Sequence, residues 1–120
     1  MRRRPLLLLA FVAAGCAGAA RLSRADLVGT TWREVCPAPE IATAYVRLDA
    51  DGVLAWSYAR PDSVRRDTVH RWAVEGGALV LRWNLGRATS RYPAGPDPAR
   101  LAASSSTFCV DDAPWLERVR

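Results

Sequence analysis

Apolar and polar residues alternate along most of the chain after residue 20, and turn-forming residues interrupt the alternation repeatedly. Because successive side chains of a β-strand point to opposite faces, a period of two is typical of strands with one buried face. Helical spacing is confined to residues 23–27, where Ser23 is placed as the N-cap. The pattern predicts about eight short strands, at residues 31–35, 43–49, 53–58, 68–74, 78–83, 89–92, 102–108 and 116–119.

Two of the predicted connections carry the glycines of a tight hairpin. Gly52 ends the turn that Asp49 begins, and Gly76 and Gly77 lie between two predicted strands. Glycine adopts the positive φ that reverses the chain, so the strands on either side are expected to pair antiparallel. Residues 49–52 also resemble the start of a calcium loop, but they lack its further ligands, which favours a plain turn.

The faces of the predicted strands set the fold class. Along these strands every second residue, and so one face of the strand, is mostly large and apolar. Examples are Leu54, Trp56 and Tyr58, and Leu79, Leu81 and Trp83. About 100 residues cannot cover a flat sheet, so the strands must curl around a common interior or stack as two sheets. The sequence therefore predicts an all-β domain, a small antiparallel up-and-down barrel or half-barrel.

The aromatic residues of this interior are the feature most open to a functional interpretation. Aromatic side chains line small-molecule pockets, and tryptophan adds an indole donor to an apolar wall. The alternative is that large side chains simply fill the interior of a small barrel. The candidate ligand-binding residues are Trp56, Tyr58, Trp72, Leu81 and Trp83.

Residues 1–20 are predicted to be a targeting segment and not part of the fold. Arg2, Arg3 and Arg4 precede an apolar run and a group of small residues, the order found in a signal peptide. The apolar run is shorter than the roughly 20 residues that cross a membrane. Small residues before Cys16 resemble the lipobox of bacterial lipoproteins, in which the cysteine is lipidated. Cleavage after Ala19 or Ala20 without lipidation is the alternative.

This segment determines the expected location of the protein. The remaining residues, 21–120, are predicted to form a single domain. Lipidation would anchor the domain in the cell envelope, on the periplasmic side of the outer membrane in a diderm host. Without lipid, the domain would be periplasmic or secreted. An anchored domain has the membrane as a partner through its N-terminal lipid.

Charge excludes one class of partner. The net charge of +5 falls to +2 when the segment is removed, and the remaining arginines are interspersed with acidic residues. Nucleic-acid binding is therefore not expected. Arg65, Arg66 and Arg71 surround one predicted loop, where they could meet anionic headgroups or acidic polysaccharide, although a solvated loop is the simpler interpretation.

The other two cysteines, Cys36 and Cys109, form an even pair in an oxidising compartment, which favours a disulfide. Such a bond would constrain the unfolded chain by about 4 kcal/mol on the loop-entropy argument. It would also join the first predicted strand to the region near the end of the domain.

Four short segments, residues 27–32, 48–54, 72–81 and 115–118, together resemble the small bacterial lipocalin-like β-barrel lipoproteins. The resemblance implies that Trp32 and Arg118 pack together and close one end of a barrel. It also implies that the domain binds a small apolar molecule. Small barrel lipoproteins that inhibit lysozymes suggest an alternative, a partner-binding module acting through exposed loops, with Arg91 as a candidate contact.

Signals of catalysis are weak. His70 is the only histidine, and it has no metal co-ligands in a recognisable spacing. Serines and aspartates occur without a nucleophile motif. The sequence is thus interpreted as a non-catalytic envelope lipoprotein with no cofactor and no metal, which binds a small apolar ligand. A partner-binding or enzyme-inhibitor module and a purely structural envelope protein are the alternatives.

Overall fold

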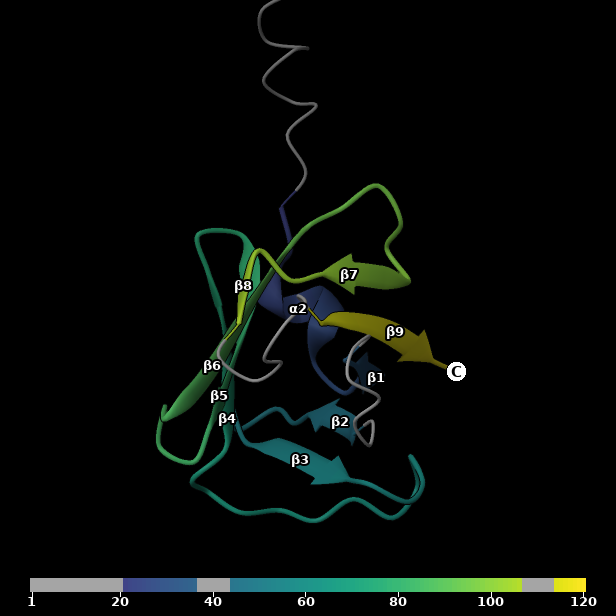
Figure 1. Cartoon of the computed structure of the whole chain (residues 1–120), viewed down its shortest axis with the longest axis vertical. Helices are drawn as coiled ribbons and strands as arrows, with labels where there is room; N and C mark the ends of the chain where they lie inside the picture. The colour runs from purple at the N-terminus through teal and green to yellow at the C-terminus, as the bar shows by residue number, and fades with distance from the viewer. Residues whose placement is uncertain (1–20, 37–43, 107–113) are drawn as a thin grey trace, which may run out of the picture.

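The computed structural model describes residues 21–36, 44–106 and 114–120. The predicted targeting segment with Cys16, and Cys109, lie outside these residues. No helix in the described ranges is long and apolar enough to span a membrane. The described elements (Figure 1) are α2 (Arg24–Leu27), β1 (Thr31–Val35), β2 (Ala44–Leu48), β3 (Leu54–Ser57), β4 (Arg71–Glu75), β5 (Ala78–Trp83), β6 (Ala88–Pro93), β7 (Arg100–Ala102), β8 (Ser105–Ser106) and β9 (Trp115–Val119).

The strands form two antiparallel sheets. One has the order β3-β2-β1-β9-β7 and the other the order β4-β5-β6-β8. In Figure 1 the strands of the first sheet run across those of the second. The prediction of a mostly β, antiparallel domain is confirmed.

The two sheets do not close into a barrel. The lipocalin-like character of the fold is therefore not confirmed and stays a prediction. They are tied at one corner, where Val53 and Arg71 form an isolated antiparallel bridge. Backbone hydrogen bonds continue on both sides of this bridge, from Leu54 N to His70 O and from Trp72 N to Gly52 O, at 2.9 and 3.0 Å. These hydrogen bonds join the two sheets to each other at the start of β4.

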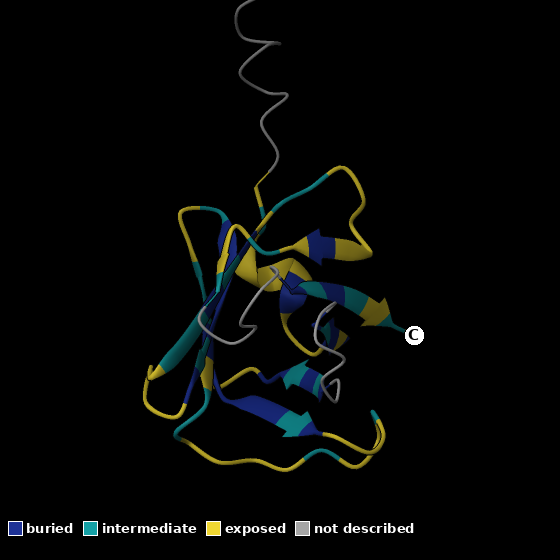
Figure 2. Cartoon of the chain, viewed as in Figure 1, coloured by how far each residue is buried: buried dark blue, intermediate teal, exposed yellow. Residues whose placement is uncertain are grey.

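Apolar side chains from both sheets fill the space between them. Figure 2 shows buried residues along β3 and β5, while exposed residues gather in the connecting loops. Burying apolar surface in this way provides most of the stabilisation of a small domain. The core cluster consists of Leu27, Trp32, Val46, Leu48, Leu54, Trp72, Leu79, Leu81, Trp83, Tyr92, Leu101 and Leu116.

Both predicted hairpins are confirmed. Gly52, with φ of +85°, donates its backbone N–H to Asp49 O at 3.0 Å in the turn between β2 and β3. The turn needs glycine for this φ, since the atom nearest to an added Cβ would be Nη2 of the flexible Arg71 side chain, which can move. Gly76 and Gly77, both with positive φ, connect β4 to β5.

The short helix forms where the sequence predicts it. Ser23 is the N-cap and accepts a hydrogen bond from Asp26 N, and Leu27 is buried. Arg24 fastens the helix to the sheets because its Nη2 donates to Ala50 O and its guanidinium lies 4.6 Å from the centre of the Trp72 ring. Helix α2 thereby covers one end of the interior.

The prediction of one strand over residues 102–108 is wrong within the described residues. β7 pairs with β9 in the five-stranded sheet, whereas β8 pairs with β6 in the other sheet. Between them, Ala103 N donates to Pro114 O and Ser104 N to Arg91 O, so the chain changes sheets there. The described residues consequently hold nine strands in place of about eight.

Candidate functional site

The most spacious of the described cavities lies beside helix α2, and we call it the helix-end cavity. Its volume is about 560 Å³. This is within the 300–1,000 Å³ typical of small-molecule sites. It lies where the segment before α2, the loop after β6 and the ends of β1, β7 and β9 meet. Its lining residues are Arg21, Leu22, Asp26, Leu27, Trp32, Ala94, Gly95, Pro98, Leu101 and Arg118.

The base of the helix-end cavity is apolar. Leu27, Trp32 and Leu101 are almost fully buried, and each comes from a different element. The Trp32 indole is fixed because its Nε1 donates to Thr30 Oγ1 at 2.7 Å, and that hydroxyl donates to Leu27 O at 2.6 Å. The Trp32 N–H is therefore already used within the fold, and the ring offers only apolar surface to a ligand.

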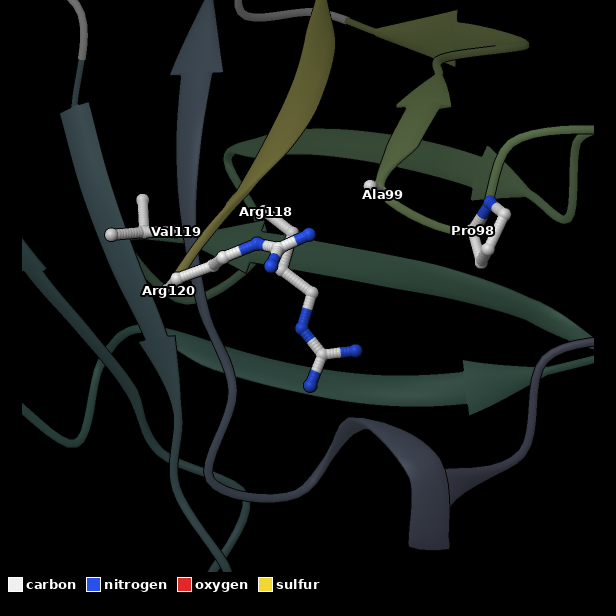
Figure 3. Close-up of a pocket in the computed structure, with 5 residues that line it drawn as sticks. All are labelled: Pro98, Ala99, Arg118, Val119 and Arg120. Carbon is white, nitrogen blue, oxygen red and sulfur yellow. The ribbon is translucent and has the colours of Figure 1, made fainter.

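The rim of the helix-end cavity is charged. Arg21 and Arg118 form no ion pair with any described residue, whereas Asp26 accepts a hydrogen bond from the Ser23 hydroxyl at 2.9 Å. Figure 3 shows the Arg118 side chain extending from β9 in the adjoining cavity, with Pro98 and Ala99 on the other wall. The cavity thus combines an apolar base with cationic side chains at its opening.

Trp32 and Arg118, which the family resemblance pairs, lie opposite each other on β1 and β9. The Arg118 guanidinium carbon is 5.9 Å from the centre of the Trp32 ring, within the range of a cation–π contact. Both residues line the helix-end cavity. Their predicted role in closing a barrel stays a prediction, because the two sheets are not a closed barrel.

The five candidate ligand-binding residues do not share one cavity among those described. Trp72, Leu81 and Trp83 are buried in the core. The Trp72 Nε1 donates to Asp49 O at 2.8 Å, which holds this side chain in a structural contact. Trp56 and Tyr58 instead line a second, more open cavity of about 320 Å³, which we call the Trp56 pocket.

Aromatic rings connect the Trp56 pocket to the core. The ring centroids of Trp56 and Tyr58 are 5.0 Å apart in an edge-to-face arrangement, and His70 lies 6.2 Å from Trp56 and 5.1 Å from Trp83. Such pairs add stability beyond the area they bury. Tyr58 is 59% exposed at the outer end of this series.

His70 makes structural contacts. Its Nδ1 accepts a hydrogen bond from Asn84 N at 3.0 Å, and its backbone O accepts from Leu54 N at the corner between the sheets. No group of three or more His, Cys, Asp or Glu side chains with metal-binding geometry occurs in the ranges that the structure describes. Cys36 is buried directly after β1; because Cys109 lies outside the described residues, the disulfide stays a prediction.

The aspartates of the β2–β3 turn are held by arginines. Asp49 accepts hydrogen bonds from Arg47 Nε at 2.5 Å and from Arg66 Nη1 at 2.7 Å, and Arg66 also binds Asp51. The hydrogen bond from Arg66 lowers the pKa of Asp51. These contacts favour the interpretation of residues 49–52 as a turn, and they anchor the loop that carries Arg65 and Arg66.

No family model matches this chain, and no curated protein or solved structure shows significant similarity to it. A functional argument therefore rests on the geometry of its own cavities.

Sequence reasoning missed most of the helix-end cavity. Leu22 and Leu101 are single apolar residues outside the predicted elements, and Leu27 ends a predicted helical segment of only five residues. The cap at Ser23 and the proline-containing loop near Pro98 were the available signals. Neither signal indicates that these segments lie together, because that depends on the packing of the two sheets.

Proposed function

We propose that this chain is a non-catalytic envelope domain that binds a small, mainly apolar ligand in the helix-end cavity. The observation that carries the proposal is the cavity of about 560 Å³ with Leu27, Trp32 and Leu101 at its base. An apolar ligand seated on this base would cover the partly exposed apolar lining, Leu22, Ala94 and Pro98, which is otherwise in contact with water, and this favours binding. The site differs from the interior site expected from sequence, because the large aromatic residues of the interior pack against one another.

The proposal includes export and anchoring through a lipid on Cys16. Arg21, the first described residue, lines the helix-end cavity and lies only five residues after Cys16. An extended chain of that length spans roughly 17 Å. Anchoring would therefore hold the cavity near the membrane surface. Intact mass spectrometry of the protein from host membranes tests this, because lipidation at Cys16 adds the mass of its acyl chains and unmodified protein would contradict it.

Binding is tested with N-phenyl-1-naphthylamine, a neutral probe that fluoresces in apolar surroundings. Wild-type protein is expected to bind it saturably with one site. Ala94→Phe places a large side chain in the lining and should weaken binding about tenfold or more. Ala59→Phe, in the Trp56 pocket, is the matched control and should leave probe binding unchanged.

Circular dichroism and the thermal midpoint establish that both variants are folded. Saturable binding lost only in Ala94→Phe supports the proposal. A wild-type protein that does not bind the probe saturably, or a folded Ala94→Phe variant with unchanged affinity, would overturn it.

A further inference from the structure

The Trp56 pocket carries a separate inference. It is lined by an aromatic pair, two serines, one alanine and one arginine: Trp56, Ser57, Tyr58, Ala59, Ser63 and Arg65. We propose that this pocket binds an acidic sugar, with a sugar ring against Tyr58 and the carboxylate of the sugar on Arg65. The site lies on different elements from the helix-end cavity and does not depend on the function proposed for it.

The aromatic pair offers a platform for a ring. Trp56 packs partly into the core, and its ring holds Tyr58 in an edge-to-face contact at 5.0 Å between centroids. Tyr58 nevertheless remains 59% exposed. Covering an exposed aromatic ring removes apolar surface from water, and the contact with Trp56 already favours one orientation of the Tyr58 ring. Tyr58 can therefore bind the apolar C–H face of a pyranose without a large ordering cost.

Arg65 determines the charge of the ligand. Its guanidinium carbon lies 6.0 Å from the centre of the Trp56 ring, and it forms no ion pair with any described residue. Arg60 and Asp62, in the same loop, form a separate ion pair that does not include Arg65. A planar guanidinium with free N–H groups beside an aromatic surface is suited to a carboxylate.

The loop that carries Arg65 is held in place. Trp56 N donates to Arg65 O at 3.0 Å, and Arg65 N donates to Trp56 O at 2.7 Å, so the two residues form an antiparallel bridge. The next residue, Arg66, is bound by both Asp49 and Asp51. The backbone positions of Trp56 and Arg65 are thus fixed relative to each other before a ligand arrives.

The hydroxyls of the pocket complete the match to a sugar. Ser57 Oγ accepts the backbone N–H groups of Ala59 and Arg60, at 3.1 and 3.4 Å, so it shapes the pocket. Ser63 is exposed in the lining and offers a hydroxyl to a sugar hydroxyl. An aromatic surface, a hydroxyl and a cation in one pocket correspond to the C–H face, the hydroxyls and the carboxylate of a uronic acid.

The experiment compares three probes by NMR, following the indole N–H signal of Trp56, which a Trp56→Phe variant assigns. Trigalacturonate carries both the sugar rings and the carboxylates, its methyl ester lacks the charge, and citrate lacks the rings. Wild-type protein is expected to bind trigalacturonate about fivefold more tightly than the ester. Citrate should cause no saturable shift of the Trp56 signal.

Two variants separate the roles of the platform and the cation. Arg65→Gln should abolish the preference for trigalacturonate over its ester, and Tyr58→Ala should weaken both sugars about five- to tenfold. Arg87→Gln and Leu85→Ala are the matched controls, since both residues are exposed outside the pocket. They should not change either affinity.

Equal binding of citrate and trigalacturonate would mean a general anion patch and would overturn the inference. Absence of saturable sugar binding, or unchanged affinities in folded Arg65→Gln and Tyr58→Ala, would overturn it as well. None of these outcomes bears on the ligand site proposed for the helix-end cavity, because binding of N-phenyl-1-naphthylamine is tested there with variants of other residues.

Discussion

The Tyr92 hydroxyl donates a hydrogen bond to Oε2 of Glu34 at 2.5 Å, across the interior between the two sheets. Glu34 is 1% exposed, and its other oxygen, Oε1, has no hydrogen-bond partner among the described residues. Burial raises the pKa of this carboxyl to about 6, while the hydrogen bond from Tyr92 lowers it in part. Burial also raises the pKa of the Tyr92 hydroxyl, so Tyr92 remains the donor.

The first prediction is that stability falls as the pH rises through the pKa of Glu34. The folded-state pKa of about 6 exceeds the ordinary value of 4.5, so the folded protein binds the proton more tightly than the unfolded chain. The stability gained from protonation is fully present below pH 4.5 and lost as the pH rises through 6. The difference in pKa corresponds to about 2 kcal/mol.

Urea unfolding of wild type and Glu34→Gln at pH 4, 5, 6, 7 and 8 measures this effect. The glutamine cannot ionise, so the difference in unfolding free energy between the two proteins should shift by about 2 kcal/mol across the series in favour of the variant. A difference that stays constant with pH would show that Glu34 does not titrate in this range.

The second prediction concerns the donor. Tyr92→Phe keeps the ring in the core but leaves a buried carboxyl with neither oxygen bound, which should cost about 1–3 kcal/mol at pH 7.5. The loss should be smaller at pH 4, because the neutral carboxyl is cheaper to bury. Tyr45→Phe, at a half-buried position of β2, is the matched control and should have little effect. An equal loss at both pH values would contradict a hydrogen bond to the ionised carboxyl.

Alternation predicts the position of strands well and their assembly poorly. β1 and β5 have the bounds expected from the sequence because turn-forming residues delimit both, although residues 78–81 of β5 are all buried and do not alternate. Glu34 interrupts this reasoning, since its parity places a carboxyl inside. Only the spatial position of Tyr92, 58 residues further along, explains how that carboxyl is accommodated.

The candidate sites show the same limit. Parity correctly predicts that Trp72 and Trp83 face the interior, whereas Trp56 is only partly buried, and parity alone does not show that any of them surrounds a ligand. Trp72 uses its N–H on Asp49, and Trp83 packs against His70. Parity specifies the face of a strand, whereas a cavity depends on whether the opposite sheet supplies enough side-chain volume to fill the space.

The third prediction tests the contact between Asp49 and its two arginines. The Asp49 side chain is only 10% exposed, and it is bound by Arg47 and Arg66. Asp49→Asn keeps the shape but loses the charge, so unfolding free energy should fall by about 1–2 kcal/mol. The comparison is Asp62→Asn, whose pair with Arg60 is exposed and long at 3.6 Å and should contribute nothing measurable. Equal effects of the two changes would refute the assigned role of Asp49.

The fourth prediction uses the turn between β5 and β6, where a leucine has a left-handed backbone. Leu85 has a φ of +61° and is 78% exposed, so it accepts an unfavourable conformation without burying its side chain. Asparagine tolerates this region better, and Leu85→Asn should raise the unfolding free energy by about 0.5–1 kcal/mol.

The control in the opposite direction is Gly86→Ala. Gly86 has a φ of +86°, and nothing lies within 4 Å of the new Cβ, so backbone strain alone should destabilise the protein by about 1 kcal/mol. Both values come from urea unfolding at pH 7, and a Leu85→Asn variant less stable than wild type would mean that the leucine side chain makes a stabilising contact.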